Sequence, residues 1–186
     1  MTPRLQGRRI AMLATDGFEQ AELEKPLVDL RGEGAEVDVV SIRHDAIQGY
    51  NHHEKGDKFT VDKTLDEVAA SDYDALVLPG GVMNPDALRL EPKAIGFVRA
   101  FVQARKPISA VCHGPWTLID ADGVSGRRVT SWPSLRADLV NAGAHWMDQE
   151  VVVDGLLVTS RMPDDLPAFI AKTVEMLEKA KTPAAG

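Results

Sequence analysis

The stretch ALVLPGG, residues 75–81, sets four apolar residues directly before a Pro-Gly-Gly turn. A short, uninterrupted apolar run is typical of a strand that is buried on both faces of a parallel sheet. Similar runs occur at residues 9–14, 37–42 and 108–111, and longer segments with helical spacing of their apolar residues lie between the runs. This alternation predicts an α/β fold with a mostly parallel central sheet.

The remaining segments complete the prediction of a single domain over residues 1–186. We expect a three-layer sandwich, flavodoxin-like in outline, with helices on both faces of the sheet. Residues 43–58 are polar and predict an irregular excursion, and residues 64–68 predict a brief helix. Residues 150–160 predict a hairpin around an Asp-Gly turn, which we expect to lie outside the parallel core. An amphipathic helix is expected over residues 163–179.

The composition disfavours several classes of protein. The 186 residues carry 21 basic and 28 acidic side chains, a net charge of −7, without a long basic run to neutralise a nucleic-acid backbone. We therefore expect no tight binding of nucleic acid and no membrane partner, since no stretch reaches the roughly 18–20 apolar residues of a spanning helix. Residues 1–9 lack the apolar centre of a secretory signal, so the cytoplasm is the expected compartment.

Three of the predicted strands are followed by chemically reactive or unusually small residues. Glu19 follows the first strand, Gly80 and Gly81 follow the strand at 75–78, and Cys112 and His113 follow the strand at 108–111. In open α/β sheets, ligands bind beyond the carboxyl ends of the strands, where the strand order changes direction. With a flavodoxin-like strand order these three strand ends are neighbours, and their residues meet in one cleft.

Cys112, the single cysteine, is the candidate nucleophile. A sharp turn from strand to helix exposes a side chain, and the N-terminal end of the helix that follows is expected to lower the pKa of the thiol. Glu19 is the candidate acid that donates a hydrogen bond to the sulfur, and His113 is the candidate proton carrier. The N–H groups of Gly80, Gly81 and His113 are candidate donors to the oxygen of a reacting carbonyl group.

Each of these residues also has an ordinary structural interpretation. A lone cysteine after an apolar strand is often a small buried hydrophobic residue, Glu19 would complement a helix dipole, and paired glycines form a turn. Asp86 is a candidate acid to orient His113, from the same chain or from a neighbouring subunit. We expect no metal and no other cofactor, because residues 52–54 (His-His-Glu) have no matching ligand cluster and no glycine-rich phosphate loop opens a helix.

Several segments together resemble the PfpI branch of the ThiJ/PfpI superfamily over about residues 9–177: FEQAEL (18–23), DALVLPGG (74–81), AVCHGP (110–115) and EVVVDG (150–155). The resemblance implies a Rossmann-like fold of the class I glutamine amidotransferase type. It also implies a homo-oligomer, a dimer or larger, with the active site near a subunit interface. In this pattern Cys112 takes the place of the nucleophile, Glu19 that of the acid facing the sulfur, and His113 that of the histidine.

The resemblance also bears on the type of reaction. Asp86 falls where protease-like members have an acid that reaches the histidine across a subunit interface, although here it is an aspartate after a loop that differs by one residue. The late His-x-Glu pair of amidotransferases is missing, since Trp146 and Met147 follow His145, so amidotransfer is disfavoured. The prediction is a cysteine-dependent hydrolase, peptidase- or deglycase-like, that acts on small peptides or carbonyl adducts in stress protection. The alternative is a non-enzymatic redox sensor or chaperone that uses Cys112.

Overall fold

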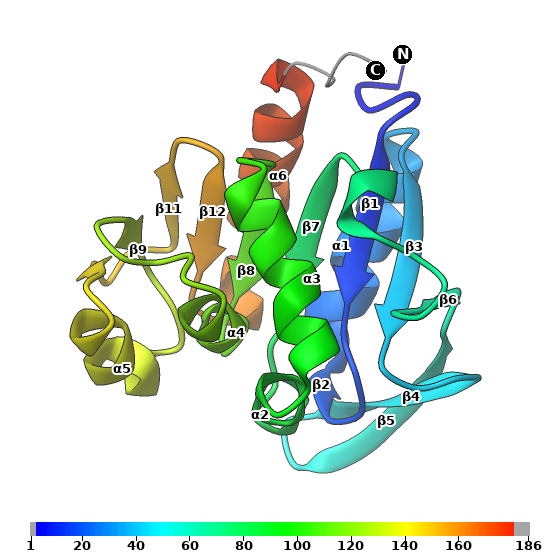
Figure 1. Ribbon diagram of the computed structural model, residues 1–186, viewed down its shortest axis with the longest axis horizontal. Coiled ribbons are helices and arrows are strands. Elements are labelled where there is room, and N and C mark those ends of the chain that lie inside the picture. The colour runs from blue at the N-terminus through cyan, green and yellow to red at the C-terminus, as the bar shows by residue number, and fades with distance from the viewer. Residues whose placement is uncertain (1–2, 181–186) are drawn as a thin grey trace.

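The computed structural model describes residues 3–180. The strands of its main sheet are β1 (Arg9–Leu13), β3 (Glu36–Ser41), β6 (Lys63–Thr64), β7 (Ala75–Leu78), β8 (Ile108–Val111), β11 (Val151–Asp154) and β12 (Leu157–Ser160). Within the described residues they form a seven-stranded sheet in the order β11-β12-β8-β7-β1-β3-β6 (Figure 1). All neighbours are parallel except β11, which runs antiparallel to β12 at one edge.

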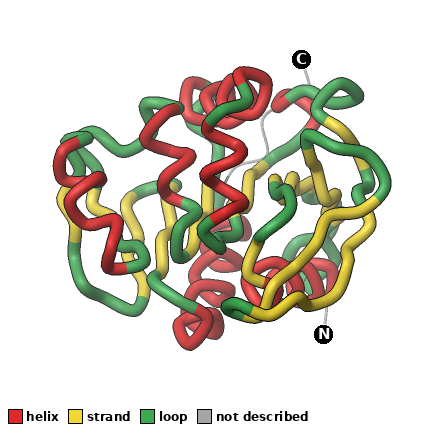
Figure 2. The backbone as a smooth tube through the Cα atoms, turned by 90° about the horizontal axis from the view of Figure 1, so that it is seen from below, coloured by secondary structure: helices red, strands yellow, loops and turns green. Residues whose placement is uncertain are grey.

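Helices cover both faces of this sheet, which is therefore the middle layer (Figure 2). One face carries α1 (Gln20–Gly32) and α6 (Leu166–Lys179); the other carries α2 (Met83–Arg89), α3 (Pro92–Gln103) and α4 (Pro115–Asp120). A side lobe contains α5 (Arg136–Asn141) and the parallel pair β9 (Arg128–Val129) and β10 (His145–Trp146). The predicted three-layer, flavodoxin-like sandwich is confirmed. Between residues 3 and 180, no helix is both long and apolar enough to cross a membrane.

Two apolar clusters join the layers. The cluster beneath α3 and α4 includes Phe97 and Phe101, whose rings meet edge to face with centroids 5.2 Å apart. The cluster beneath α1 and α6 includes Phe18 and Phe169. Every residue of β7 is buried, because each face of this central strand meets a helical layer. This double burial explains the uninterrupted apolar run in its sequence.

Residues 43–58 are ordered as most of a β-hairpin, which corrects the expected irregular excursion. Its strands are β4 (Ala46–Asn51) and β5 (Glu54–Thr60), and β2 (Phe18–Glu19) pairs with β4 to give a three-stranded sheet. In the hairpin, Ile47 is buried in the apolar core and Phe59 packs against it. Because so few of its residues contact the core, its strands show little alternation of apolar and polar residues. Its turn at His52 and His53 contains no glycine, and His52 adopts a φ of 59°. The sequence therefore lacks the usual hairpin signals.

Residues 64–68 do not form the predicted helix. The carboxylate of Glu67 accepts hydrogen bonds from the backbone N–H of Thr64 (2.7 Å) and from its hydroxyl group (3.0 Å), and so closes a turn after β6. A side chain that satisfies a nearby backbone N–H in this way competes with helix formation.

The hairpin expected over residues 150–160 is present as β11 and β12, but its place in the sheet differs from the prediction. β12 pairs in parallel with β8, with Leu157 opposite Ile108 and Ser160 opposite Val111. All four residues of β12 are buried. The second hairpin strand therefore belongs to the parallel core, and only β11 is an antiparallel addition at the edge.

Candidate active site

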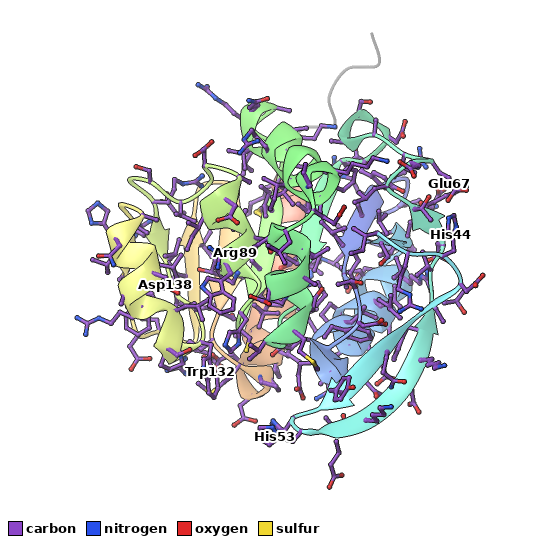
Figure 3. All side chains as sticks on the ribbon, turned by 60° about the horizontal axis from the view of Figure 1, so that its bottom comes forward. His44, His53, Glu67, Arg89, Trp132 and Asp138 are labelled. Atoms are coloured by element: carbon purple, nitrogen blue, oxygen red, sulfur yellow. The ribbon has the colours of Figure 1, made fainter. Side chains whose placement is uncertain are left out.

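The three strands that were expected to carry the site, β1, β7 and β8, are neighbours in the sheet, and their carboxyl ends share one edge. α2, β2 and the β4–β5 hairpin gather at that edge (Figure 1). A cavity of about 780 Å³ opens there, and Cys112, His113 and Gly81 line it. Trp132 and His53 also line the cavity, and Figure 3 shows both at this end of the molecule.

Cys112 lies in a strained turn between β8 and α4. Its φ is 61°, in the left-handed region that residues other than glycine rarely adopt. Its N–H donates to the carbonyl of Ser160 (3.0 Å), and its own carbonyl accepts from the N–H of Trp132 (2.9 Å). The residue is 7% exposed and lines the cavity. Backbone strain of this kind clusters at functional sites, and here it presents a thiol at the cavity wall.

The acid beside the sulfur is Glu22, which corrects the assignment of Glu19 to that place. Glu22 is fully buried in the first turn of α1, where its Oε2 accepts a hydrogen bond from the N–H of Gly80 (2.8 Å) and its carboxyl group lies beside the Cys112 thiol. Glu19 precedes the helix at the cavity wall, and its Oε2 accepts from the N–H of His52 (3.1 Å). Residues three positions apart lie on the same side of a helix, about one turn from each other. Glu22 therefore points to the same side as Glu19 but lies one turn further into the protein, beside the sulfur.

Burial changes the proton affinities of Glu22 and Cys112. Loss of hydration raises the pKa of Glu22 to about 8, so this carboxyl group is mainly protonated at neutral pH. Its Oε2 faces the N–H of Gly80, and no nitrogen or oxygen atom between residues 3 and 180 pairs with Oε1. Burial also raises the pKa of the Cys112 thiol; a charged Glu22 raises it further, whereas the N–H groups of Gly81 and His113 lower it.

Burial of the sulfur outweighs the expected lowering of the thiol pKa by the following helix. α4 spans six residues, and a helix this short carries little dipole to offset the desolvation of a buried sulfur. The direction of the shift favours the thiol over the thiolate in the resting protein. A buried thiol of this kind needs a base at the moment it reacts.

His113 can provide that base. Its Nδ1 lies 3.3 Å from Sγ of Cys112, a contact that the irregular turn allows between adjacent residues. Burial lowers the pKa of His113 to about 4, so the imidazole is neutral and able to accept a proton at pH 7. Trp132 stacks on the ring at an interplanar angle of 23°, and Trp116 meets it at 66°. The two indoles shield the imidazole from water and fix its orientation.

Gly80 and Gly81 have different roles. Gly81 lies beside Cys112 at the cavity wall, and its N–H, like that of His113, lowers the pKa of the thiol. The N–H of Gly80 is engaged by Glu22, which corrects its assignment as a donor to a reacting oxygen. A Cβ atom on Gly80 would lie 2.5 Å from Oε2 of Glu22 and 2.8 Å from Cβ of Cys112, so this close approach requires glycine.

Comparison with known proteins places this chain in a family. A sequence model of the DJ-1/PfpI family matches residues 8–176. The chain belongs to this family. Protein/nucleic acid deglycase 2 of Escherichia coli (strain K12) is 44% identical over 171 residues, which cover 91% of this chain and 98% of that protein. General stress protein 18 of Bacillus subtilis (strain 168) is 41% identical over 175 residues, which cover 93% of this chain and 99% of that protein.

A solved structure shares the DJ-1/PfpI fold. The two-domain protein of Anabaena variabilis, with DJ-1/ThiJ/PfpI-like and ferritin-like domains, matches this chain with a TM-score of 0.85 and 34% identity. The match covers 95% of this chain and 52% of the Anabaena chain, so our protein spans about half the length of that structure. The family resemblance expected from the sequence motifs is confirmed.

Asp86 is not brought to the site within one chain. It lies on the exposed side of α2, it does not line the cavity, and no hydrogen bond joins it to His113 in the described part of the chain. Its contact with the histidine of a neighbouring subunit stays a prediction. The same part of the chain contains no group of three His, Cys, Asp or Glu side chains that could hold a metal ion.

Sequence reasoning missed Glu22, although the sequence contains a signal for it. Glu22 lies on the same face of α1 as Leu23, Pro26, Leu27 and Leu30, all of which are buried. A carboxyl group on the apolar face of a helix is costly unless it is protonated or paired. Such a residue is a candidate for a functional site on that ground alone.

Proposed function

We propose that this member of the DJ-1/PfpI family is a cysteine-dependent hydrolase that removes carbonyl adducts from amines or cleaves small peptides, as part of protection against stress. One observation carries the proposal: the Cys112 thiol lies 3.3 Å from a neutral imidazole at the wall of a large cavity. The deglycase name of one relative supports this class of activity, and the stress-protein name of the other supports a role in protection against stress. A reactive thiol needs a reducing compartment, and we therefore propose the cytoplasm.

In the proposed reaction, Sγ of Cys112 attacks the electrophilic carbon of the substrate while Nδ1 of His113 accepts the thiol proton. On an acyl substrate, negative charge develops on the carbonyl oxygen, and the N–H groups of Gly81 and His113 stabilise it. The imidazolium returns the proton to the departing amine, and water then hydrolyses the carbon–sulfur bond. Glu22 stays neutral beside the sulfur, so no carboxylate opposes the transient negative charge.

The test compares the wild type with Cys112→Ser and His113→Gln on short peptides and on amines modified by a small dicarbonyl compound. We expect Cys112→Ser to lose activity by about a thousandfold or more, and His113→Gln by about a hundredfold. Glu19→Gln is the matched control, because it removes an acid from the cavity wall without touching the sulfur. Full activity of Cys112→Ser on every substrate would overturn the proposal.

The redox-sensor alternative has weaker support from the geometry. Oxidation of a thiol to sulfenic acid follows its thiolate character and its exposure. Cys112 is 7% exposed and its pKa is raised, so we expect slow oxidation. Rapid gain of oxygen at Cys112 in mild peroxide, seen by mass spectrometry in a protein without turnover, would favour the sensor.

We further propose a homo-oligomer, a dimer or larger, in which Asp86 of one subunit approaches the site of another. The support is the apolar surface around Asp86, where Val82, Met83 and Leu90 are each at least half exposed. Exposed apolar groups in one segment are typical of an interaction surface. Light scattering should give a mass of at least two chains, and Asp86→Asn should lower activity without changing that mass. A fully active monomer would contradict this proposal.

A further inference from the structure

The N–H of Gly81 has to be aimed at the sulfur, and a buried side chain on α2 is placed to aim it. Asn84 is 0% exposed and lies three residues beyond Gly81. Its Nδ2 donates to the carbonyl oxygens of Pro79 (3.1 Å) and Gly80 (3.0 Å), and its Oδ1 accepts from the N–H of Thr15 (2.8 Å). The side chain thus binds the loop after β7 to the loop after β1.

The geometry of one peptide group connects Asn84 with the reaction centre. The carbonyl of Gly80 and the N–H of Gly81 belong to the same planar trans peptide, in which C=O and N–H point in opposite directions. Asn84 holds that carbonyl on one side, so the N–H must point to the other side, toward Cys112, whose Cβ lies 2.8 Å from where a Cβ on Gly80 would stand. Rotation of the peptide would break the Asn84 contact and turn the N–H away from the sulfur.

Only an amide fits the three partners of Asn84. The side chain faces two acceptors, the carbonyls of Pro79 and Gly80, and one donor, the N–H of Thr15. A reversed amide would set oxygen against both carbonyls and NH₂ against an N–H, so the hydrogen bonds determine its orientation. The other polar group of Gly80, its N–H, is held by Glu22. Side chains therefore restrain Gly80 from both sides, although glycine itself has the most flexible backbone of all residues.

We propose that Asn84 is a positioning residue for the reaction at Cys112, which holds the Gly80–Gly81 peptide so that its N–H faces the sulfur and the developing oxyanion. The part of this inference that concerns catalysis rests on the proposed hydrolase function. Its geometric part concerns the resting thiol alone and can be measured without a substrate.

The experiment uses two variants of the full chain. Asn84→Asp keeps the shape and the acceptor for Thr15 but loses both donors, and Asn84→Ser is uncharged but too short to hold both carbonyls. Alkylation of Cys112 by iodoacetamide is followed across a range of pH, because its rate reports the thiolate fraction and access to the sulfur. We expect both variants to react about tenfold more slowly at a given pH, with the profile moved to higher pH. We also expect kcat to fall about ten- to a hundredfold with little change in KM.

Tyr73→Phe is the matched control for a merely structural role. It removes the part-buried hydrogen bond from Tyr73 to Asp38 (2.7 Å) at the opposite end of β7, so it should lower stability without moving the alkylation profile. If Asn84→Ser keeps the wild-type pH profile of alkylation, the inference is overturned. Any effect of Asn84→Asp would then be due to its added charge. Cys112→Ser with full activity would refute the hydrolase function instead, while the alkylation result would still decide whether Asn84 aims the peptide.

Discussion

Glu22→Gln tests the central electrostatic feature of the site, a carboxyl group that keeps its proton because it is fully buried. The variant preserves the shape of the side chain and an acceptor for the N–H of Gly80, which lies 2.8 Å from Oε2 in the wild type. It removes the ability to ionise. The perturbation therefore separates the charge of Glu22 from its packing.

The expected change in the free energy of unfolding follows from the pKa of Glu22 in the folded and in the unfolded chain. The pKa of Glu22 is about 8 in the folded chain, against an ordinary value of 4.5. Between these values the folded chain binds more protons than the unfolded chain, so the free energy of unfolding falls as pH rises. The loss is about 1.4 kcal/mol per pH unit, and on the order of 5 kcal/mol over the whole interval. Glu22→Gln has no such loss, so its stability relative to the wild type should grow with pH.

The assay is urea unfolding between pH 5 and pH 8, followed by tryptophan fluorescence. The difference in unfolding free energy, Glu22→Gln minus wild type, should rise by about 3 kcal/mol between pH 5 and pH 7.5. Taking this difference cancels the contribution of His113, whose lowered pKa makes stability rise with pH below about 6.5. Glu24→Gln, on the exposed side of the same helix, is the matched control. A difference that stays constant over this range would refute a buried, protonated Glu22.

Three further substitutions test the packing around the site. Gly80→Ala places a methyl group 2.5 Å from Oε2 of the neighbouring acid, so we expect a loss of about 1–3 kcal/mol in urea unfolding together with slower alkylation of the thiol. Trp132→Ala uncovers His113, whose pKa should rise from about 4 toward 6.5 in an NMR titration. Arg161→Leu leaves the buried carboxylate of Asp165 without its partner at 2.9 Å, which should cost about 3–5 kcal/mol in urea unfolding.

Two of these changes have a reference variant, and the third has an outcome that would contradict it. Gly96→Ala adds a methyl group where no atom lies within 4 Å, so it should leave the alkylation rate unchanged. Arg4→Leu breaks a surface pair with Glu178, which should leave the urea midpoint nearly unchanged. A pKa of His113 that stays near 4 in Trp132→Ala would show that the indole does not exclude water from the ring.

The strand pattern was readable from the sequence because burial on both faces leaves a direct trace. β7 coincides with the predicted strand at residues 75–78, and β8 with the predicted strand at 108–111. The β4–β5 hairpin left no such trace, since it contributes few apolar residues to the core and its turn at His52 and His53 has no glycine. Periodicity reports apolar contacts, so elements that make few of them are missed.

Site residues were likewise predictable only where a buried strand fixed their position. Cys112 and His113 were identifiable because they follow a strand whose end fixes their position. The choice between Glu19 and Glu22 depended on where α1 begins, and it begins at Gln20. Glu19 and Glu22 are one helical turn apart, and this distance separates the wall of the cavity from the sulfur. Asn84 carries no signal at all in a single sequence, because its role arises from the path of the backbone after β7.

The pH dependence of the reaction follows from the two shifted groups together. His113 is neutral above a pKa of about 4, and Glu22 is protonated below a pKa of about 8, so between these values thiol, acid and base are all uncharged. A cavity with buried, poorly hydrated polar groups favours that neutral state. We expect kcat/KM to rise with pH through the ionisation of His113 and to fall through that of Glu22, because a carboxylate beside the sulfur opposes the charge that develops there. Glu22→Gln should lose the alkaline decline and keep the acid limb. A rate that increases steadily through pH 8 in the wild type would instead indicate a reaction limited by simple thiolate formation, and would refute the role given to Glu22.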